Sequence, residues 1–191
     1  MASLLPNADP VHKVSIVARG RAGGYTLKLP VEDRRLQSKK EFLDDIAMSL
    51  GGYVAEELIF GDVTTGPSND LQVSTSLARA MVTRWGMSDA IGPVALESDG
   101  GKIIHGYVDG GKDYSEEMSA VIDREVKKIM TDSLELARKT IGENKKVLDA
   151  IAKKLLEVET LEQDEYNKLI MTFGIKPKKR EEGKEAIDIV G

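Results

Sequence analysis

Carboxylates and imidazoles are the main side chains of this chain that could bind a metal ion, because it contains no cysteine. There are only two histidines, His12 and His105, and 93 positions separate them. The notable carboxylates are the adjacent Glu56 and Glu57 and the isolated Asp70. Zinc sites almost always use three or four protein ligands, so none of these residues makes a site alone. Nothing in the spacing brings His12, His105 and Asp70 together as a new metal site.

Asp70 stands at the start of a segment with helical periodicity. Gly66-Pro67 breaks the preceding chain, Ser68 is of a type that caps helices, and Gly86 is a plausible end. Between them, apolar residues recur at spacings of three and four, with a gap near Ser74: Leu71, Leu77, Ala78, Met81, Val82 and Trp85. Since a carboxylate in the first turn complements the helix dipole, Asp70 taken alone is interpreted as a structural charge.

The elements that must position these side chains are mainly helical, with a small β element near the N-terminus. Residues 13–18 and 24–29 alternate apolar and polar side chains, which predicts a hairpin or two neighbouring strands. Ser38 is expected to cap a helix that runs to about Phe60. Gly51-Gly52 lies inside that helix, where a glycine face would let another backbone approach.

The second half of the chain predicts three more helices and a second hairpin. The helices are expected over residues 115–142, from Asn144 onward, and after a capping box formed by Thr160 and Gln163. Glycine-rich turns bracket the apolar runs 94–96 and 103–108, which predict the hairpin. Residues 175–191 are charged and aperiodic and are interpreted as a disordered tail, with its KPKKR run solvated.

Composition narrows the function classes. The chain has 27 Lys and Arg residues against 32 Asp and Glu residues, a formal net charge of -5, which argues against a nucleic-acid partner. No apolar run approaches the 18 residues that a membrane-spanning helix requires, so we expect a soluble chain.

Residues 50–94, LGGYVAEELIFGDVTTGPSNDLQVSTSLARAMVTRWGMSDAIGPV, closely resemble the protease domain of the FtsH family. Its members are membrane-anchored, ATP-dependent zinc metalloproteases of bacteria, mitochondria and chloroplasts. Four further segments are similar to the family: DPVHKVSIVARG (9–20), GGYTLKLPVED (23–33), DYSEE (113–117) and ETLEQDEY (159–166). The resemblance implies that residues 1–174 form a largely helical peptidase domain, a part that follows an ATPase module in the family.

The resemblance also implies roles for the carboxylates. The family's zinc is held by the two histidines of an H-E-x-x-H helix and by an aspartate in a G-A-S-N-D segment, which resembles residues 66–70 here. Asp70 is therefore expected to be a zinc ligand, and Pro67 replaces the usual alanine. Glu56 or Glu57 could hydrogen-bond a zinc-bound histidine, since the family places their helix near the metal. The alternative for both is a solvated helix face or a structural pair.

The 191 residues contain no H-E-x-x-H. In the family this motif lies just before the part that residues 1–13 resemble, so we expect the chain to be truncated inside the catalytic helix. Two zinc ligands and the general base would then be absent, and the chain as given is expected to be inactive and to bind zinc weakly. The alternative is a non-catalytic remnant used for oligomerisation or scaffolding.

The family's other properties follow as expectations. Its members degrade unfolded or membrane-extracted proteins inside a ring, expected to be a hexamer, fed by the ATP-driven module. The resemblance implies the cytoplasmic face of the bacterial inner membrane, or the matrix or stroma side in an organelle. His12 is expected to be structural at a strand start, and His105 to lie at the surface of the glycine-rich hairpin.

Overall fold

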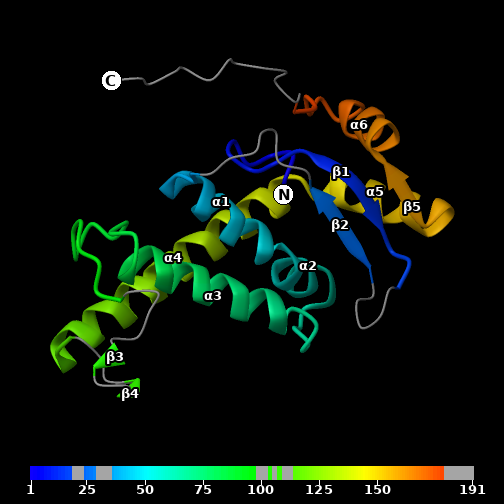
Figure 1. Cartoon of the computed structure of the whole chain (residues 1–191). Coiled ribbons are helices and arrows are strands. Elements are labelled where there is room, and N and C mark those ends of the chain that lie inside the picture. The colour runs from blue at the N-terminus through cyan, green and yellow to red at the C-terminus, as the bar shows by residue number, and fades with distance from the viewer. Residues whose placement is uncertain (19–23, 29–35, 98–102, 105–106, 109–113, 179–191) are drawn as a thin grey trace, which may run out of the picture. The chain divides into compact units, whose positions relative to one another are not determined.

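The computed structural model describes residues 1–18, 24–28, 36–97, 103–104, 107–108 and 114–178. Its elements, in chain order, are β1 (Val11–Ser15), β2 (Tyr25–Lys28), α1 (Lys39–Ser49), α2 (Gly51–Phe60), α3 (Ser68–Thr83), β3 (Ile103–Ile104), β4 (Tyr107–Val108), α4 (Glu116–Glu143), α5 (Lys145–Val158), β5 (Thr160–Glu162) and α6 (Gln163–Met171) (Figure 1). The fold is mainly α-helical with a small β element, as predicted.

The chain divides into two compact units. The helical unit consists of Met1 and residues 37–143, and the mixed unit consists of residues 2–36 and 144–191. No helix in the described ranges has both the length and the apolar character needed to cross a membrane.

The helical unit is organised around α4, which contacts α1, α2 and α3 (Figure 1). The apolar stripes predicted from the sequence supply much of its core. In the α3 region, however, Trp85 is 46% exposed, whereas Ser74, at the predicted gap of the stripe, is buried. Buried core residues are Phe42, Ile46, Ala47, Leu50, Val54, Ala78, Met81, Val82, Ile122, Val126, Ala137 and Ile141. Full burial of one such large aliphatic side chain contributes roughly 1.5–3 kcal/mol, so this core stabilises the position of α3.

The helix expected over residues 38–60 is two helices, because the chain bends at Leu50, whose φ and ψ are -72° and -6°. Its predicted start is confirmed: Ser38 and Glu41 form a capping box at α1. The close backbone approach expected at the two glycines is wrong for the described residues. A Cβ on Gly51 would meet the Met1 side chain at 3.0 Å, and one on Gly52 would meet nothing within 4 Å.

The segment after α3 folds back along the end of that helix. Trp85 stacks on Phe42 with ring centroids 4.7 Å apart, and Gly86 adopts a positive φ of 60°. The backbone N–H groups of Leu96 and Glu97 both donate to the Thr83 carbonyl. Residues 94–96 are therefore no strand, and the antiparallel pairing that the structure describes in the glycine-rich region is that of β3 with β4.

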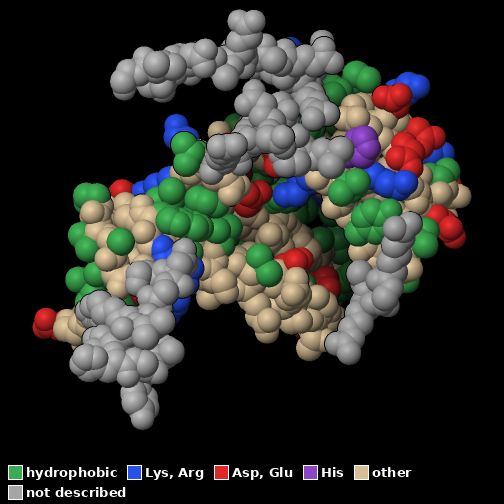
Figure 2. Space-filling model, in the orientation of Figure 1, with side chains coloured by type: hydrophobic (Ala, Val, Ile, Leu, Met, Phe, Trp, Pro, Cys, Tyr) green, Lys and Arg blue, Asp and Glu red, His purple; other side chains and the backbone are tan. Residues whose placement is uncertain are grey.

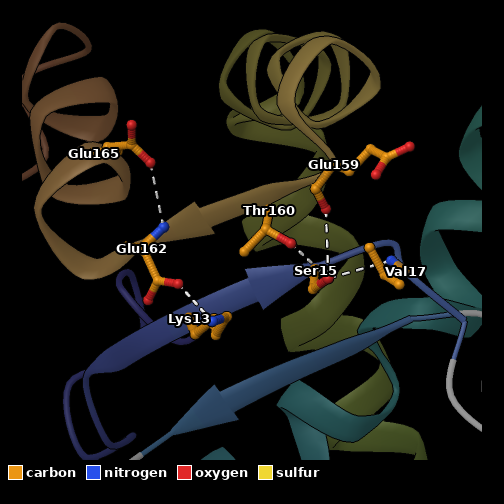
Figure 3. Close-up of polar contacts among 7 residues, drawn as sticks. All are labelled: Lys13, Ser15, Val17, Glu159, Thr160, Glu162 and Glu165. Carbon is orange, nitrogen blue, oxygen red and sulfur yellow. Dashed lines mark hydrogen bonds and ion pairs between the residues drawn. The ribbon is translucent and has the colours of Figure 1, made fainter.

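The mixed unit holds a three-stranded sheet in the order β2-β1-β5, with both pairs antiparallel. The predicted pairing of the two N-terminal strands is confirmed. The third strand was not predicted, and it comes from the other end of the chain. The Ser15 and Thr160 hydroxyls lie 2.8 Å apart (Figure 3). The Ile16 N–H donates to the Glu159 carbonyl.

Because residues 160–162 pair with β1, the capping box of α6 differs from the expected one. It is formed by Glu162 and Glu165, whereas the Thr160 side chain bonds Ser15 (Figure 3). A second connection between distant segments places Ser3 Oγ 2.8 Å from the Tyr166 hydroxyl. The mixed unit thus ties the start of the chain to its last helix. The predicted disordered tail lies mostly in 179–191, outside the described residues.

Candidate functional site

Asp70 lies where the sequence places it, as the third residue of α3, and its side chain is exposed. The expected cap is wrong: Pro67 is the N-cap and Ser68 is already in the first turn, since the Leu71 N–H donates to the Pro67 carbonyl at 3.0 Å. Within the described ranges, no hydrogen bond or ion pair occupies the Asp70 carboxylate. It is therefore free to bind a ligand from outside the helical unit.

Glu56 lies on α2 and holds the turn that leads into α3. Its Oε2 accepts a hydrogen bond from the Thr64 backbone N–H at 2.7 Å, and its Oε1 accepts one from the Thr64 hydroxyl at 3.2 Å. The Thr64 hydroxyl in turn accepts a hydrogen bond from the Gly66 N–H at 3.0 Å. Sequence reasoning did not single out Thr64, whose only local signal is its place in the Thr-Thr-Gly-Pro stretch between two helices.

Glu57 faces a different partner. The Arg138 guanidinium on α4 donates two hydrogen bonds to it, Nε to Oε2 and a terminal nitrogen to Oε1, both at 2.8 Å. This two-pronged pair joins α2 to α4 and corresponds to the structural pair that the sequence left open as an alternative. The hydrogen bonds from Arg138 lower the pKa of the Glu57 carboxyl below its usual value and raise the pKa of the Arg138 side chain.

We expect the pKa of Glu57, measured by NMR titration, to lie below the usual glutamate value and to return to it in an Arg138→Met variant. An Arg138→Lys variant should give an intermediate pKa, because lysine keeps the charge but loses the fork of donors. Since the folded-state pKa is the lower one, the pair stabilises the fold above the unfolded-state pKa. That contribution is lost as the pH falls through the folded-state value. Identical titration curves for the three proteins would contradict this assignment.

The two histidines contribute no metal site that the structure describes. His12 is half-buried in β1 of the mixed unit, and His105 lies outside the described residues. No group of three or more His, Asp or Glu side chains that could hold a metal ion occurs among the described residues. Asp70 fits the role of a single exposed carboxylate ligand, and the described residues do not form a complete zinc site around it.

The molecular surface gives no large patch of one charge on the face shown in Figure 2, where Lys and Arg side chains lie scattered among Asp and Glu side chains. Salt bridges between helices of the helical unit are exposed, as between Arg79 on α3 and Asp123 on α4. What the described residues offer at this place is one exposed carboxylate at a helix start, preceded by a hydrogen-bonded turn.

Comparison with known proteins gives a family match. The sequence profile of Peptidase family M41 matches residues 1–169. A protein of Pseudothermotoga lettingae described as "ATP-dependent zinc metalloprotease FtsH" is 48% identical over 174 residues, which cover 90% of this chain and 28% of the relative. Proteins with the same description from Bacillus subtilis and Thermotoga maritima are 46% identical over 169 residues and 44% identical over 172 residues. These cover 87% and 89% of this chain and 26% and 28% of the relatives. The chain thus spans less than a third of the length of the relatives it matches.

Proposed function

The chain belongs to peptidase family M41, and from this membership we propose that its residues 1–174 form the peptidase part of an FtsH-like, ATP-dependent zinc metalloprotease. The observation that carries the proposal is the exposed Asp70 carboxylate at the start of α3, which has no hydrogen-bond or ion-pair partner in the part of the chain that the structure describes. It lies in the segment that resembles the family's ligand-bearing one, and we assign it the role of one zinc ligand.

Asp70 alone cannot hold zinc tightly, because zinc sites almost always use three or four protein ligands. In this proposal the two histidines of an H-E-x-x-H helix complete the set, and the glutamate of that motif is the general base. None of these residues is in the 191-residue sequence. When bound, zinc would supply a water of lowered pKa and polarise the scissile carbonyl. The 191 residues by themselves are therefore proposed to be inactive.

The substrates and partners follow from the family as part of the same proposal. They are unfolded or membrane-extracted polypeptides, delivered by an ATP-driven module to a ring, a hexamer in this proposal. The ring would be membrane-anchored, with this part on the cytoplasmic, matrix or stroma side. The support is the similarity to proteins described as ATP-dependent zinc metalloproteases.

A zinc titration tests the proposal on two chains. The first is the 191-residue chain, and the second is the same chain preceded by an H-E-x-x-H helix of the FtsH pattern, called the extended chain below. Calorimetry should find a one-to-one site tighter than about micromolar only in the extended chain, since only it has three ligands. A tight site in the 191-residue chain that is lost in Asp70→Ala would contradict the proposal that Asp70 needs the two histidines of H-E-x-x-H to hold zinc. Failure of the extended, folded chain to bind zinc would favour a non-catalytic scaffold.

A further inference from the structure

The turn between α2 and α3 is built around one side chain, Thr64. The C-cap of α2 is Gly61, which adopts a positive φ of 70° and donates its N–H to the Glu57 carbonyl. The chain then reverses direction over a few residues, and Asp70 follows six positions after Thr64. The path of this short turn decides where α3 begins and hence where the Asp70 carboxylate lies.

Thr64 links Glu56 to Gly66 through its hydroxyl and its backbone N–H. A threonine hydroxyl has one proton to donate and two lone pairs to accept with. Here the hydroxyl donates to Glu56 and accepts from the Gly66 N–H, while the Thr64 backbone N–H donates to the other Glu56 oxygen. The result is a chain of hydrogen bonds from a carboxylate on α2 to the backbone two residues before Ser68, the first residue of α3.

Gly66 shows how closely this turn packs on the carboxylate. A Cβ at Gly66 would lie 3.0 Å from Glu56 Oε1 and 3.2 Å from Thr64 Oγ1, both tighter than ordinary contact. The next backbone bond, from the Ser68 N–H to the Thr65 carbonyl at 3.1 Å, closes the turn onto the first residue of α3. The carboxylate, the hydroxyl and the glycine therefore form one unit, called here the Thr64 relay.

We propose that the Thr64 relay positions the metal ligand: Thr64 and Glu56 fix the start of α3 and thereby the placement of the Asp70 carboxylate. The inference rests on the proposed role of Asp70. A zinc ligand must be held within about 0.5 Å of its productive position by supporting contacts. For Asp70, the hydrogen bonds of the preceding turn are such contacts. Thr64 and Glu56 act through the backbone and do not touch the metal. Glu56 would thus support Asp70 through the turn before α3, and not by hydrogen-bonding a zinc-bound histidine.

The first test measures the turn without any metal, by amide hydrogen exchange in the 191-residue chain. Thr64→Val keeps the shape of the side chain and removes only the hydroxyl, so the Gly66 amide loses its acceptor. Its exchange should accelerate several-fold to about ten-fold. Thr65→Val is the matched control, because only the Thr65 backbone carbonyl takes part in the turn, and it should leave Gly66 exchange unchanged. Equal exchange in all three proteins would overturn the relay.

The second test measures zinc affinity in the extended chain. Thr64→Val and Glu56→Gln should each weaken zinc binding about 10- to 100-fold, the range typical of residues that orient a ligand. Thr64→Ser keeps the hydroxyl and should bind zinc within about three-fold of the parent affinity. Thr65→Val should have the same zinc affinity as the parent extended chain. Circular dichroism of each variant confirms that the helical unit remains folded.

The outcomes separate this inference from the function on which it rests. If Thr64→Val accelerates Gly66 exchange but leaves zinc affinity within about two-fold, the positioning role is overturned and the ligand role of Asp70 stands. If Asp70→Ala also leaves zinc affinity unchanged, the proposed zinc site itself is overturned. If Thr64→Val unfolds the chain, the comparison passes to Glu56→Gln, and unchanged zinc affinity in that variant would overturn the inference.

Discussion

An Asp70→Asn variant of the extended chain should bind zinc more than about 100-fold more weakly than its parent. Changing a residue that only orients a ligand typically costs 10- to 100-fold in affinity, so loss of a charged ligand should cost more. Asparagine keeps the size and the helix-start position of the side chain but removes its negative charge. Calorimetry measures the affinity, and cleavage of an unstructured peptide should fall to the buffer blank in the variant at submicromolar free zinc.

Asp62→Asn is the matched control for this prediction. It removes the same charge from the turn before α3, where Asp62 accepts a hydrogen bond from the Val63 N–H. If zinc affinity depends on ligation, Asp62→Asn should change it by less than about three-fold, because an exposed charge at a distance is largely screened. Equal losses in the two variants would show that general electrostatics, not coordination by Asp70, holds the metal.

A Gly86→Ala variant should destabilise the 191-residue chain by about 2–5 kcal/mol. The first cause is the backbone, since a non-glycine residue at a φ near +60° costs roughly 1–2 kcal/mol. The second cause is overlap: a Cβ at this position would lie 2.9 Å from Pro93 Cα and 3.2 Å from the Val94 nitrogen. These are backbone atoms, and moving them costs about 1–3 kcal/mol. Urea unfolding followed by circular dichroism measures the difference.

Two other glycines separate these causes. Gly92 has a φ of 85° but nothing within 4 Å of a built Cβ, so Gly92→Ala should cost only the backbone part. Gly142 lies inside α4 with open space around it, so Gly142→Ala should stabilise by about 0.5–1 kcal/mol. A Gly86→Ala variant within about 0.5 kcal/mol of its parent would mean that residues 84–97 can move away at little cost.

Periodicity predicted the helices and much of their buried faces, because hydrophobic burial follows each segment's own pattern. It failed in the α3 region at Trp85, which is exposed, and at Ser74, which is buried. Ser38 as a cap was also readable from residue type, whereas α3 ends at Thr83, before the end predicted at Gly86. The bend at Leu50 was not, because its neighbours continue the apolar spacing across it. The strand β5 was missed because three residues are too few for an alternating pattern, and its partner lies about 145 positions away.

The residues of the candidate site were harder to predict from local sequence than the helices were. Asp70 in isolation reads as a helix-start charge, and only the resemblance to a family gave it a chemical role. Glu56 and Glu57 were indistinguishable in sequence. Adjacent residues on a helix point in different directions, and only packing decides which one meets the turn and which one meets Arg138. Thr64 escaped notice because its role depends on the path of the turn, which residue types alone do not specify.

The three-stranded sheet of the mixed unit cannot be completed until late in the synthesis of the chain. β1 lies between β2 and β5, so the strand at residues 11–15 cannot be paired on both sides until residues 160–162 have been made. At about 5–20 residues per second, the ribosome needs roughly 7–30 s to cover that interval. During this time the β1 edge that later receives β5 presents free backbone groups to any neighbouring nascent chain. Residues 37–143, which carry their own core, can fold within the same interval.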